Sequence, residues 1–129
     1  MALQDLVYKE LSFLLVGLAF EAFNILGPGH LEKYYQNAYE ELLKREMLSF
    51  RKQVYLPLEF NRKIIGKNFI DVIVEDKIVI EFKVAERFTK FHFEQTTHYL
   101  KHTGHQLGLL ILFSNKEVLH KRVLNLYPR

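Results

Sequence analysis

The chain of 129 residues is 49% hydrophobic and carries a formal net charge of +3. This composition excludes general disorder, and the length predicts one domain, residues 1–129, with a core of its own. Cysteine is absent, which excludes a disulfide framework and a thiolate metal site and makes no demand on an oxidising compartment. The mild positive charge is compatible with a polyanionic partner but does not require one.

The first segment, about residues 4–26, repeats apolar residues at helical spacing, which predicts a helix with a broad apolar face. Gly27-Pro28-Gly29 follows and is typical of a helix end. The apolar run Leu11–Phe20 inside this helix is too short to span a bilayer, and no clear cleavage site follows it. We therefore expect a cytoplasmic protein without membrane association.

A second helix is predicted over about residues 30–48. Its inward residues by spacing are Leu31, Tyr35, Ala38, Leu42 and Met47. Residues 54–60 then alternate apolar and polar side chains, as a half-buried strand does, and Pro57 predicts that this strand is an edge or is bulged.

The C-terminal part predicts a helix over residues 89–103 that Gly104 ends. Residues 106–113 form a nearly continuous apolar run, which is typical of a strand buried on both faces. The tail, residues 121–126, fits a final strand or a short helix. The order of elements indicates an α+β or α/β fold with a mixed sheet covered by helices.

The most informative segment lies between these parts, where two β-branched runs flank Glu75-Asp76-Lys77. This pattern predicts a β-hairpin with a three-residue loop, in which Asp71 lies directly opposite Glu81. Alternation then places Asp71, Glu81 and Lys83 on one face. The opposite face is apolar throughout and carries Ile70, Val72, Val74, Ile78, Ile80, Phe82 and Val84.

Two carboxylates and a lysine on one face have two interpretations. They suit a hard, oxygen-preferring cation and the water that it activates. Alternatively, Asp71 and Lys83 form an ordinary cross-strand ion pair on a solvated sheet face, with Glu81 as a neighbour. The hairpin by itself does not decide between them.

A wider set of motifs resembles a known family. Gly29-His-Leu-Glu32-Lys-Tyr-Tyr35 has the form G-x-x-E-x-x-Y. Together with Asp71…Glu81-Phe-Lys83 and with His92-x-x-Gln95, in this order, it resembles the GxxExxY protein family, which is grouped with the PD-(D/E)XK nuclease superfamily. The segments Tyr99–Gly104 and Gly108–Phe113 extend the resemblance over nearly the whole chain. It implies an α+β, α/β-like fold with a restriction-endonuclease-like core, a mixed four- to five-stranded sheet flanked by helices.

The resemblance also implies a nuclease that hydrolyses phosphodiester bonds of DNA or RNA with Mg²⁺ or Mn²⁺. Asp71 and Glu81 would bind the metal, helped by the Phe82 carbonyl and by Glu32. Lys83 would orient the attacking water and stabilise developing negative charge, and Gln95 would complete the site. Three acids that converge without metal repel one another, so we expect at least one raised carboxyl pKa unless Lys83 neutralises the group.

Other residues carry alternative interpretations. Glu32 in the first turn of a helix is also favoured there by the helix dipole. His92 lies one turn before Gln95 and would face phosphate or metal only in some arrangements. His98 and His102, four residues apart with His105 behind, suggest a zinc pair, but no acid or cysteine completes the ligand set and solvated histidines are the preferred interpretation.

Two other functions are consistent with the same fold. A non-catalytic nucleic-acid-binding module would keep the fold with a broken acid-lysine set, whereas here the set is intact. A self-assembling structural protein is suggested by eleven phenylalanines and seven tyrosines, which is more apolar surface than one small core hides. For the nuclease, so short a chain leaves little room for a separate recognition domain, so substrate choice would depend on a homodimer, a larger homo-oligomer or a partner protein.

Overall fold

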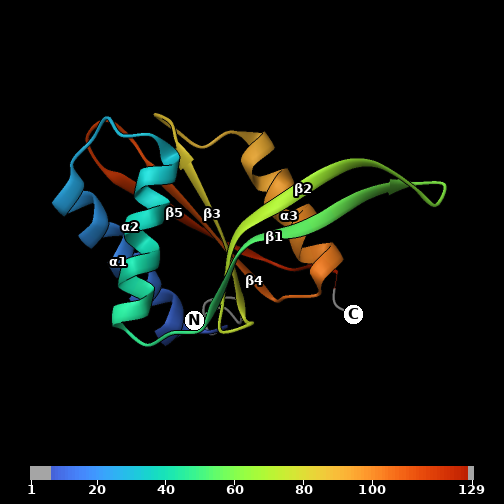
Figure 1. Ribbon diagram of the computed structural model, residues 1–129, viewed down its shortest axis with the longest axis horizontal. Helices are drawn as coiled ribbons and strands as arrows, with labels where there is room; N and C mark the ends of the chain where they lie inside the picture. The colour runs from blue at the N-terminus through green and yellow to red at the C-terminus, as the bar shows by residue number, and fades with distance from the viewer. Residues whose placement is uncertain (1–6, 128–129) are drawn as a thin grey trace.

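The protein is described by a computed structural model that places residues 7–127. Two helices, α1 (Lys9–Leu26) and α2 (Glu32–Arg45), cover one face of a sheet, and α3 (Lys90–Thr103) covers the other (Figure 1). The strands in spatial order are β1 (Phe50–Phe60), β2 (Lys63–Val74), β3 (Ile78–Val84), β4 (Leu107–Phe113) and β5 (Val118–Leu124). Only β3 and β4 are parallel, so the sheet is mixed, as predicted.

The three predicted helices are confirmed, but their ends differ from the predicted ends. Residues 4–6 of the predicted first helix lie outside the described residues, and α1 begins at Lys9, after Tyr8 with φ of 49°. The second helix begins at Glu32, so Leu31 precedes it and is exposed instead of facing the core. The prediction that Met47 faces inward is also wrong, because the helix ends at Arg45 and Met47 has φ of 56°. Gly104, in the left-handed region, caps α3 as expected.

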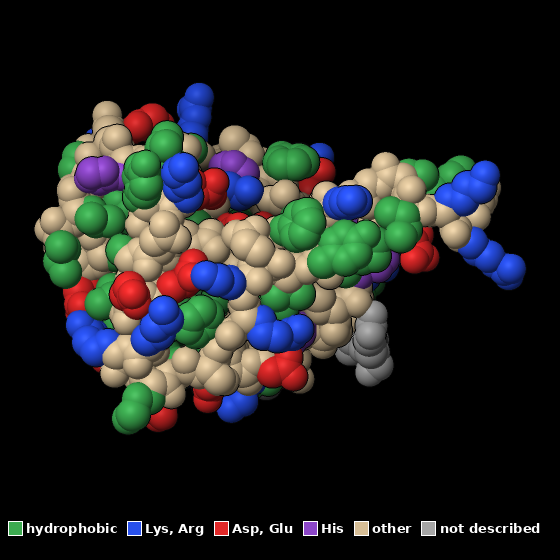
Figure 2. All heavy atoms as spheres, in the orientation of Figure 1, with side chains coloured by type: hydrophobic (Ala, Val, Ile, Leu, Met, Phe, Trp, Pro, Cys, Tyr) green, Lys and Arg blue, Asp and Glu red, His purple; other side chains and the backbone are tan. Residues whose placement is uncertain are grey.

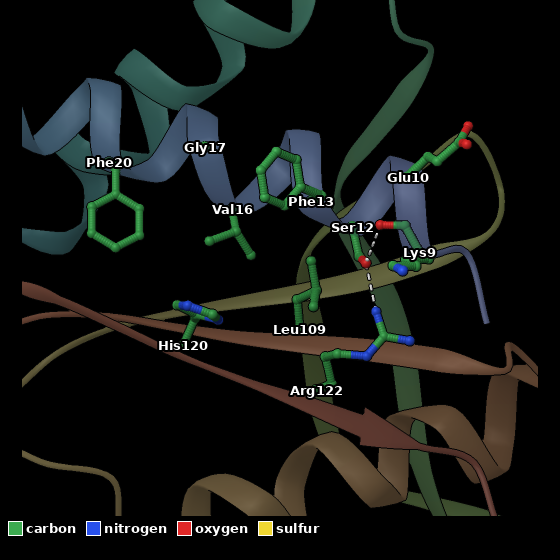
Figure 3. Close-up of a pocket in the computed structure, with 10 residues that line it drawn as sticks. All are labelled: Lys9, Glu10, Ser12, Phe13, Val16, Gly17, Phe20, Leu109, His120 and Arg122. Carbon is green, nitrogen blue, oxygen red and sulfur yellow. Dashed lines mark hydrogen bonds between the residues drawn. The ribbon is translucent and has the colours of Figure 1, made fainter. Parts of the chain in front are cut away.

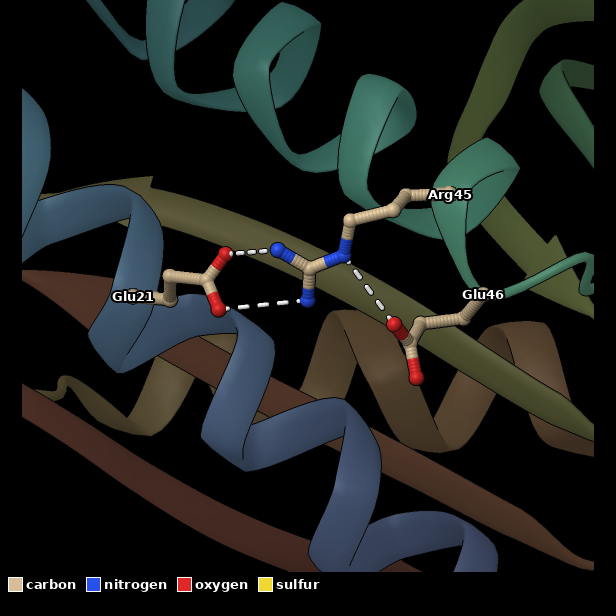
Figure 4. A network of polar contacts seen from close by, with 3 residues as sticks. All are labelled: Glu21, Arg45 and Glu46. Carbon is tan, nitrogen blue, oxygen red and sulfur yellow. Dashed lines mark hydrogen bonds and ion pairs between the residues drawn. The ribbon is translucent and has the colours of Figure 1, made fainter.

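Arg45 joins the two helices that share a face of the sheet. Its guanidinium donates to both carboxylate oxygens of Glu21 on α1 and to Glu46 just after α2 (Figure 4). These groups are exposed, so the pairs contribute little free energy and mainly fix geometry. The apolar contacts beneath them supply the stabilisation, with Tyr35, Tyr39 and Leu43 of α2 fully buried.

Strand β4 forms the centre of the protein. Every one of its residues is buried, which confirms the expectation from its continuous apolar run. A Cβ atom on Gly108 would lie 2.7 Å from Cγ2 of Thr96, so only glycine lets α3 approach this strand so closely. Strand β5 beyond it confirms the strand alternative for the tail, although it spans Val118–Leu124 rather than residues 121–126.

Strands β1 and β2 run past the rest of the sheet as a two-stranded arm (Figure 1). Strand β1 begins at Phe50, earlier than predicted, and is an edge strand, as Pro57 indicated. Strand β2 pairs with β3 only over Val72–Val74, whereas it pairs with β1 over nearly its full length. Beyond the Val72–Ile80 pair, β2 and β3, the two strands of the predicted hairpin, therefore diverge.

Opposite the point of divergence, β1 has an unusual backbone conformation. Gln53 lies between the paired residues Lys52 and Val54 and has φ of 49°. Ile70 of β2 packs under α3 with Ile73, whereas Val72 packs on the opposite face with residues of α1 and α2, so Ile70 does not share a face with Val72 as alternation had predicted. Val84, at the far end of the predicted apolar face, is exposed. Within residues 7–127 no helix has the length and apolar character needed to cross a membrane.

Candidate acidic site at the junction of β2 and β3

Asp71 and Glu81 meet where β2 leaves β3. The pairs Val74–Ile78, Ile73–Val79 and Val72–Ile80 confirm the predicted three-residue loop, and Asp71 and Glu81 come next in this register. The backbone amide of Asp71 donates to Oε2 of Glu81 at 2.8 Å, and the backbone amide of Phe82 donates to Oδ2 of Asp71 at 2.9 Å. The two carboxyl groups also lie close enough for each to affect the pKa of the other.

Burial makes this carboxyl pair electrostatically unfavourable. Glu81 is only 2% exposed, and burial followed by the charge of Asp71 raises its pKa well above the ordinary value. Burial also raises the pKa of Asp71, although hydrogen bonds from Phe82 and Glu81 and the charge of Lys83 oppose the change. The expectation of a raised carboxyl pKa is confirmed. A pair of this kind holds a proton or attracts a cation.

Lys83 lies beside the pair without neutralising it. Its amine donates to Oε1 of Gln95 on α3 at 2.8 Å. No Lys83 ion pair within 4 Å occurs among residues 7–127, so its effect on the two acids is a longer-range Coulombic one. The interpretation as an exposed cross-strand ion pair is therefore wrong, because α3 covers this face of the hairpin and buries Glu81.

Glu32 approaches the site from the first turn of α2. Burial and then the charge of Asp71 raise the pKa of Glu32, while Lys83 lowers it. Glu32 is thus half-buried and within Coulombic range of Asp71 and Lys83, which adds to the favourable position of an acid in the first turn of a helix. One turn later, Gln36 donates from Nε2 to the backbone oxygen of Asp71 at 3.2 Å and so holds α2 against β2.

Tyr35 explains the third position of the G-x-x-E-x-x-Y motif. Its ring is buried and stacks on Phe113 with centroids 4.3 Å apart. Its hydroxyl donates to the backbone oxygen of Gly27 at 2.6 Å. Gly29, with φ of 91°, turns the chain between these contacts into α2. Tyr35 thus packs in the core, fixes the loop before α2 and thereby sets where Glu32 points.

Three residues around the acids were not found by sequence reasoning. Gln36 lies four residues after Glu32, and this helical spacing was a usable signal. Gln53 hydrogen bonds to Asp71 from β1, and no local pattern indicated it. Tyr99 on α3 lies near both acids: burial, then the charges of Glu81 and Asp71, raise its pKa to about 12. Gln95, which was predicted, contacts both Tyr99 and Lys83.

The histidines of α3 have other roles or remain outside the site. Nδ1 of His92 accepts a hydrogen bond from the Thr89 backbone in a capping box at the start of α3, so this nitrogen is occupied. Burial and then the charge of Lys83 lower the pKa of His92. The rings of His98 and His102 lie 4.3 Å apart, while His105 is bonded to Asp76.

The donor chemistry of the acidic site fits a hard divalent cation. Asp71 and Glu81 offer carboxylate oxygens, the donor type that Mg²⁺ and Mn²⁺ prefer. In the part of the chain that the structure describes, no three His, Asp or Glu side chains lie together so that they could hold a metal ion, and Glu32 therefore does not complete a three-acid ligand group with Asp71 and Glu81. A pair of carboxylates agrees with the usual coordination of Mg²⁺, which binds one or two protein carboxylates and retains waters or phosphate oxygens as its other ligands.

An apolar hollow lies elsewhere in the protein. It has a volume of about 600 Å³ and lies between α1 and strands β4 and β5 (Figure 3). Phe13, Phe20 and His120 line it, and none of its lining residues belongs to the acidic site. Arg122 closes one end with a hydrogen bond to Ser12.

Comparisons with known proteins agree with the architecture. The family model of the PD-(D/E)XK nuclease superfamily matches residues 9–123. The crystal structure of SSO0001 has a similar fold, with a TM-score of 0.58 and 20% sequence identity over 97% of this chain. The match covers 61% of that chain, so this protein spans about three fifths of its length. No curated protein sequence matches significantly.

Proposed function

The chain belongs to the PD-(D/E)XK nuclease superfamily, and on this basis we propose that it hydrolyses phosphodiester bonds of DNA or RNA at the acidic site. The observation that carries the proposal is the pairing of the buried Glu81 with the half-buried Asp71, beside a lysine that no carboxylate within residues 7–127 neutralises. Structural acids are normally paired with a cation or left in water. This pair has neither arrangement, which is the state expected of a site that receives a cation.

The proposed cofactor is Mg²⁺ or Mn²⁺, held by Asp71 and Glu81 with the Phe82 carbonyl, while Glu32 lies within Coulombic range of Asp71. Such an ion supplies Lewis-acid stabilisation of a phosphate and lowers the pKa of a bound water. The residues of this chain prepare the remaining features. Gln95 holds the Lys83 amine at a fixed place, where its charge stabilises negative charge that develops on the phosphate and orients the attacking water. Gln36 keeps α2, and with it Glu32, against the strand that carries Asp71.

We also propose membership of the GxxExxY family within this superfamily. Its support is that each of the three motif positions has a role near the site: Gly29 turns the chain, Tyr35 anchors the turn to Gly27, and Glu32 lies within Coulombic range of Asp71.

A metal-dependent cleavage assay tests the function. Purified protein is incubated with labelled single-stranded and duplex DNA and RNA in Mg²⁺, Mn²⁺ or EDTA, with Asp71→Asn as the matched control. We expect cleavage by the wild type only with metal, and none by the variant. Metal-independent cleavage, or equal cleavage by Asp71→Asn, would contradict the proposed site. Binding without cleavage under all conditions would indicate the non-catalytic nucleic-acid-binding alternative.

One observation favours self-association as a second property. Phe13 on α1 is 83% exposed beside the apolar hollow, and β5 forms an open edge of the sheet. A homodimer or larger homo-oligomer would cover this surface. Light scattering coupled to size-exclusion chromatography tests it: Phe13→Ser should shift an oligomer toward the monomer, and a monomeric wild type at high concentration would contradict it.

A further inference from the structure

The outer part of the β1–β2 arm, residues 55–69, projects from the fold without a core of its own. No residue between 55 and 69 is buried, although the two strands stay paired through this region, with one register shift between Leu58 and Glu59. Figure 1 shows the arm projecting past α3 and away from the sheet. A two-stranded ribbon without a core is only marginally stable by itself. An arm of this length therefore has little structural use for the rest of the fold.

The charge of the arm selects an anionic partner. Arg62, Lys63 and Lys67 lie at and near its tip, against one acid, Glu59. All three basic residues are exposed and, among the described residues, none has an ion-pair partner. Figure 2 shows basic side chains at the outer end of the arm. Asn61 and Arg62 both have positive φ and form the tight turn that presents this end.

The inner end of the arm carries an aromatic pair beside the acidic site. Tyr55 and Phe69 lie opposite each other in the ladder, their ring centroids are 5.5 Å apart, and each is 47% exposed. Phe69 is two residues from Asp71, and Tyr55 is two residues from Gln53, which bonds to Asp71. By alternation Lys67 lies on the same face as Phe69, next outward.

We propose that the β1–β2 arm binds the nucleic-acid strand that enters the acidic site, with an unpaired base on the Tyr55–Phe69 pair and phosphates on the basic tip. This inference rests on the proposed function. It narrows the proposed substrate to nucleic acid with unpaired bases. Exposed aromatic rings stack on bases of any sequence, and lysine and arginine neutralise the backbone. Lys63 lies six residues from Phe69, about 20 Å along a strand, so the arm follows several nucleotides.

Equilibrium binding in EDTA tests the arm independently of cleavage. Fluorescein-labelled 20-nucleotide single strands and the matched duplex are titrated by fluorescence anisotropy at several salt concentrations. The first variant combines Tyr55→Ala with Phe69→Ala. We expect it to bind the single strand at least about fivefold more weakly, because base stacking is lost, and to leave duplex binding nearly unchanged.

The second variant combines Arg62→Ala, Lys63→Ala and Lys67→Ala. We expect it to lower the slope of log affinity against log salt by about 2 on single strands. Its matched control removes three exposed lysines outside the arm, Lys9, Lys44 and Lys116, and should change the slope less. The substituted side chains of the arm are exposed, so we expect each variant to fold. Circular dichroism is the control that checks this.

Each outcome decides the inference. Wild-type affinity in the aromatic variant, an unchanged salt slope in the arm variant, or an equal effect of the control variant would overturn it. A change of oligomeric state in the arm variants that accounts for the loss would also overturn it, because the exposed apolar residues of the arm would then contact a second copy. Arm-dependent binding by a wild type that cuts nothing in metal refutes the nuclease and leaves the arm assignment intact.

Discussion

Asp71 and Glu81 each accept a hydrogen bond from the backbone of the opposite strand: Glu81 from the amide of Asp71, and Asp71 from the amide of Phe82. The carboxylates thus continue the contacts of the hairpin at the point where its ladder of backbone bonds ends. The groups proposed to bind a cation also hold the strands together. Substitutions at these positions must therefore be read for stability as well as for activity.

The stability of the metal-free protein should fall as pH rises from about 4.5 toward neutrality. The pKa of Glu81 is raised in the folded state, as are those of Asp71 and Glu32, so these three carboxyl groups bind more protons in the folded state than in the unfolded state in this range. Stability then declines with pH through the folded pKa values. Urea unfolding in EDTA at a series of pH values measures the slope.

Glu81→Gln is the matched control for this pH dependence. The amide keeps the size of the side chain and removes the charge that burial disfavours. We expect a shallower decline with pH and, near neutrality in EDTA, a stability at least equal to that of the wild type. A variant whose stability falls as steeply as that of the wild type would show that Glu81 does not titrate in this range.

Metal should stabilise the wild type by linkage, because an ion that binds the folded state shifts the unfolding equilibrium. We expect Mg²⁺ or Mn²⁺ to raise the Tm of the wild type and to leave the Tm of Asp71→Ala unchanged, as measured by differential scanning fluorimetry. An equal rise in both proteins would place the bound ion away from the acidic site.

Neighbouring residues of β3 should separate chemistry from packing. Lys83→Ala should abolish cleavage with little loss of stability, because its amine donates a single hydrogen bond, to Gln95, among the described residues and lies off the apolar core. Phe82→Ala should cost about 3–5 kcal/mol, because this ring is fully buried against Tyr39. Initial rates and denaturant midpoints measure the two effects. Full activity in Lys83→Ala with metal present would exclude the proposed role of the lysine.

Glu32→Gln distinguishes a site residue from a helix-dipole charge. A carboxylate placed only for the dipole contributes about 0.3–1 kcal/mol, which the variant would lose. Because burial and Asp71 already raise the pKa of Glu32, we expect no loss of stability in EDTA and a marked loss of cleavage. A destabilised variant with normal activity would support the dipole role.

Tyr35→Phe tests the anchor of the loop before α2. Removing the hydroxyl deletes the bond to Gly27 and should cost about 1 kcal/mol, while the stacking on Phe113 remains. The denaturant midpoint measures this loss. We expect activity to fall as well, since Glu32 begins the helix that this contact positions, and unchanged activity would show that the loop holds Glu32 without it.

Local sequence determined much of the architecture. The Gly-Pro-Gly stop, the apolar run of β4 and the polar loop at residues 75–77 each act within a few residues, so the order of elements and the register of Asp71 opposite Glu81 followed from them. The exact ends were less predictable, because Tyr8 and Met47 adopt positive φ without being glycine.

Only the tertiary structure decided the environment of the acids. Strict alternation along β2 would place Ile70 and Val72 on one face, but in the folded protein Ile70 packs under α3 and Val72 packs on the opposite face. The burial of Glu81 depends on α3, which follows it in the chain and packs over it from outside the hairpin. The sequence by itself determined which side chains carry charge and on which strands they stand. Their pKa values depend on how much water and charge surrounds them, and this is settled only when distant segments pack together.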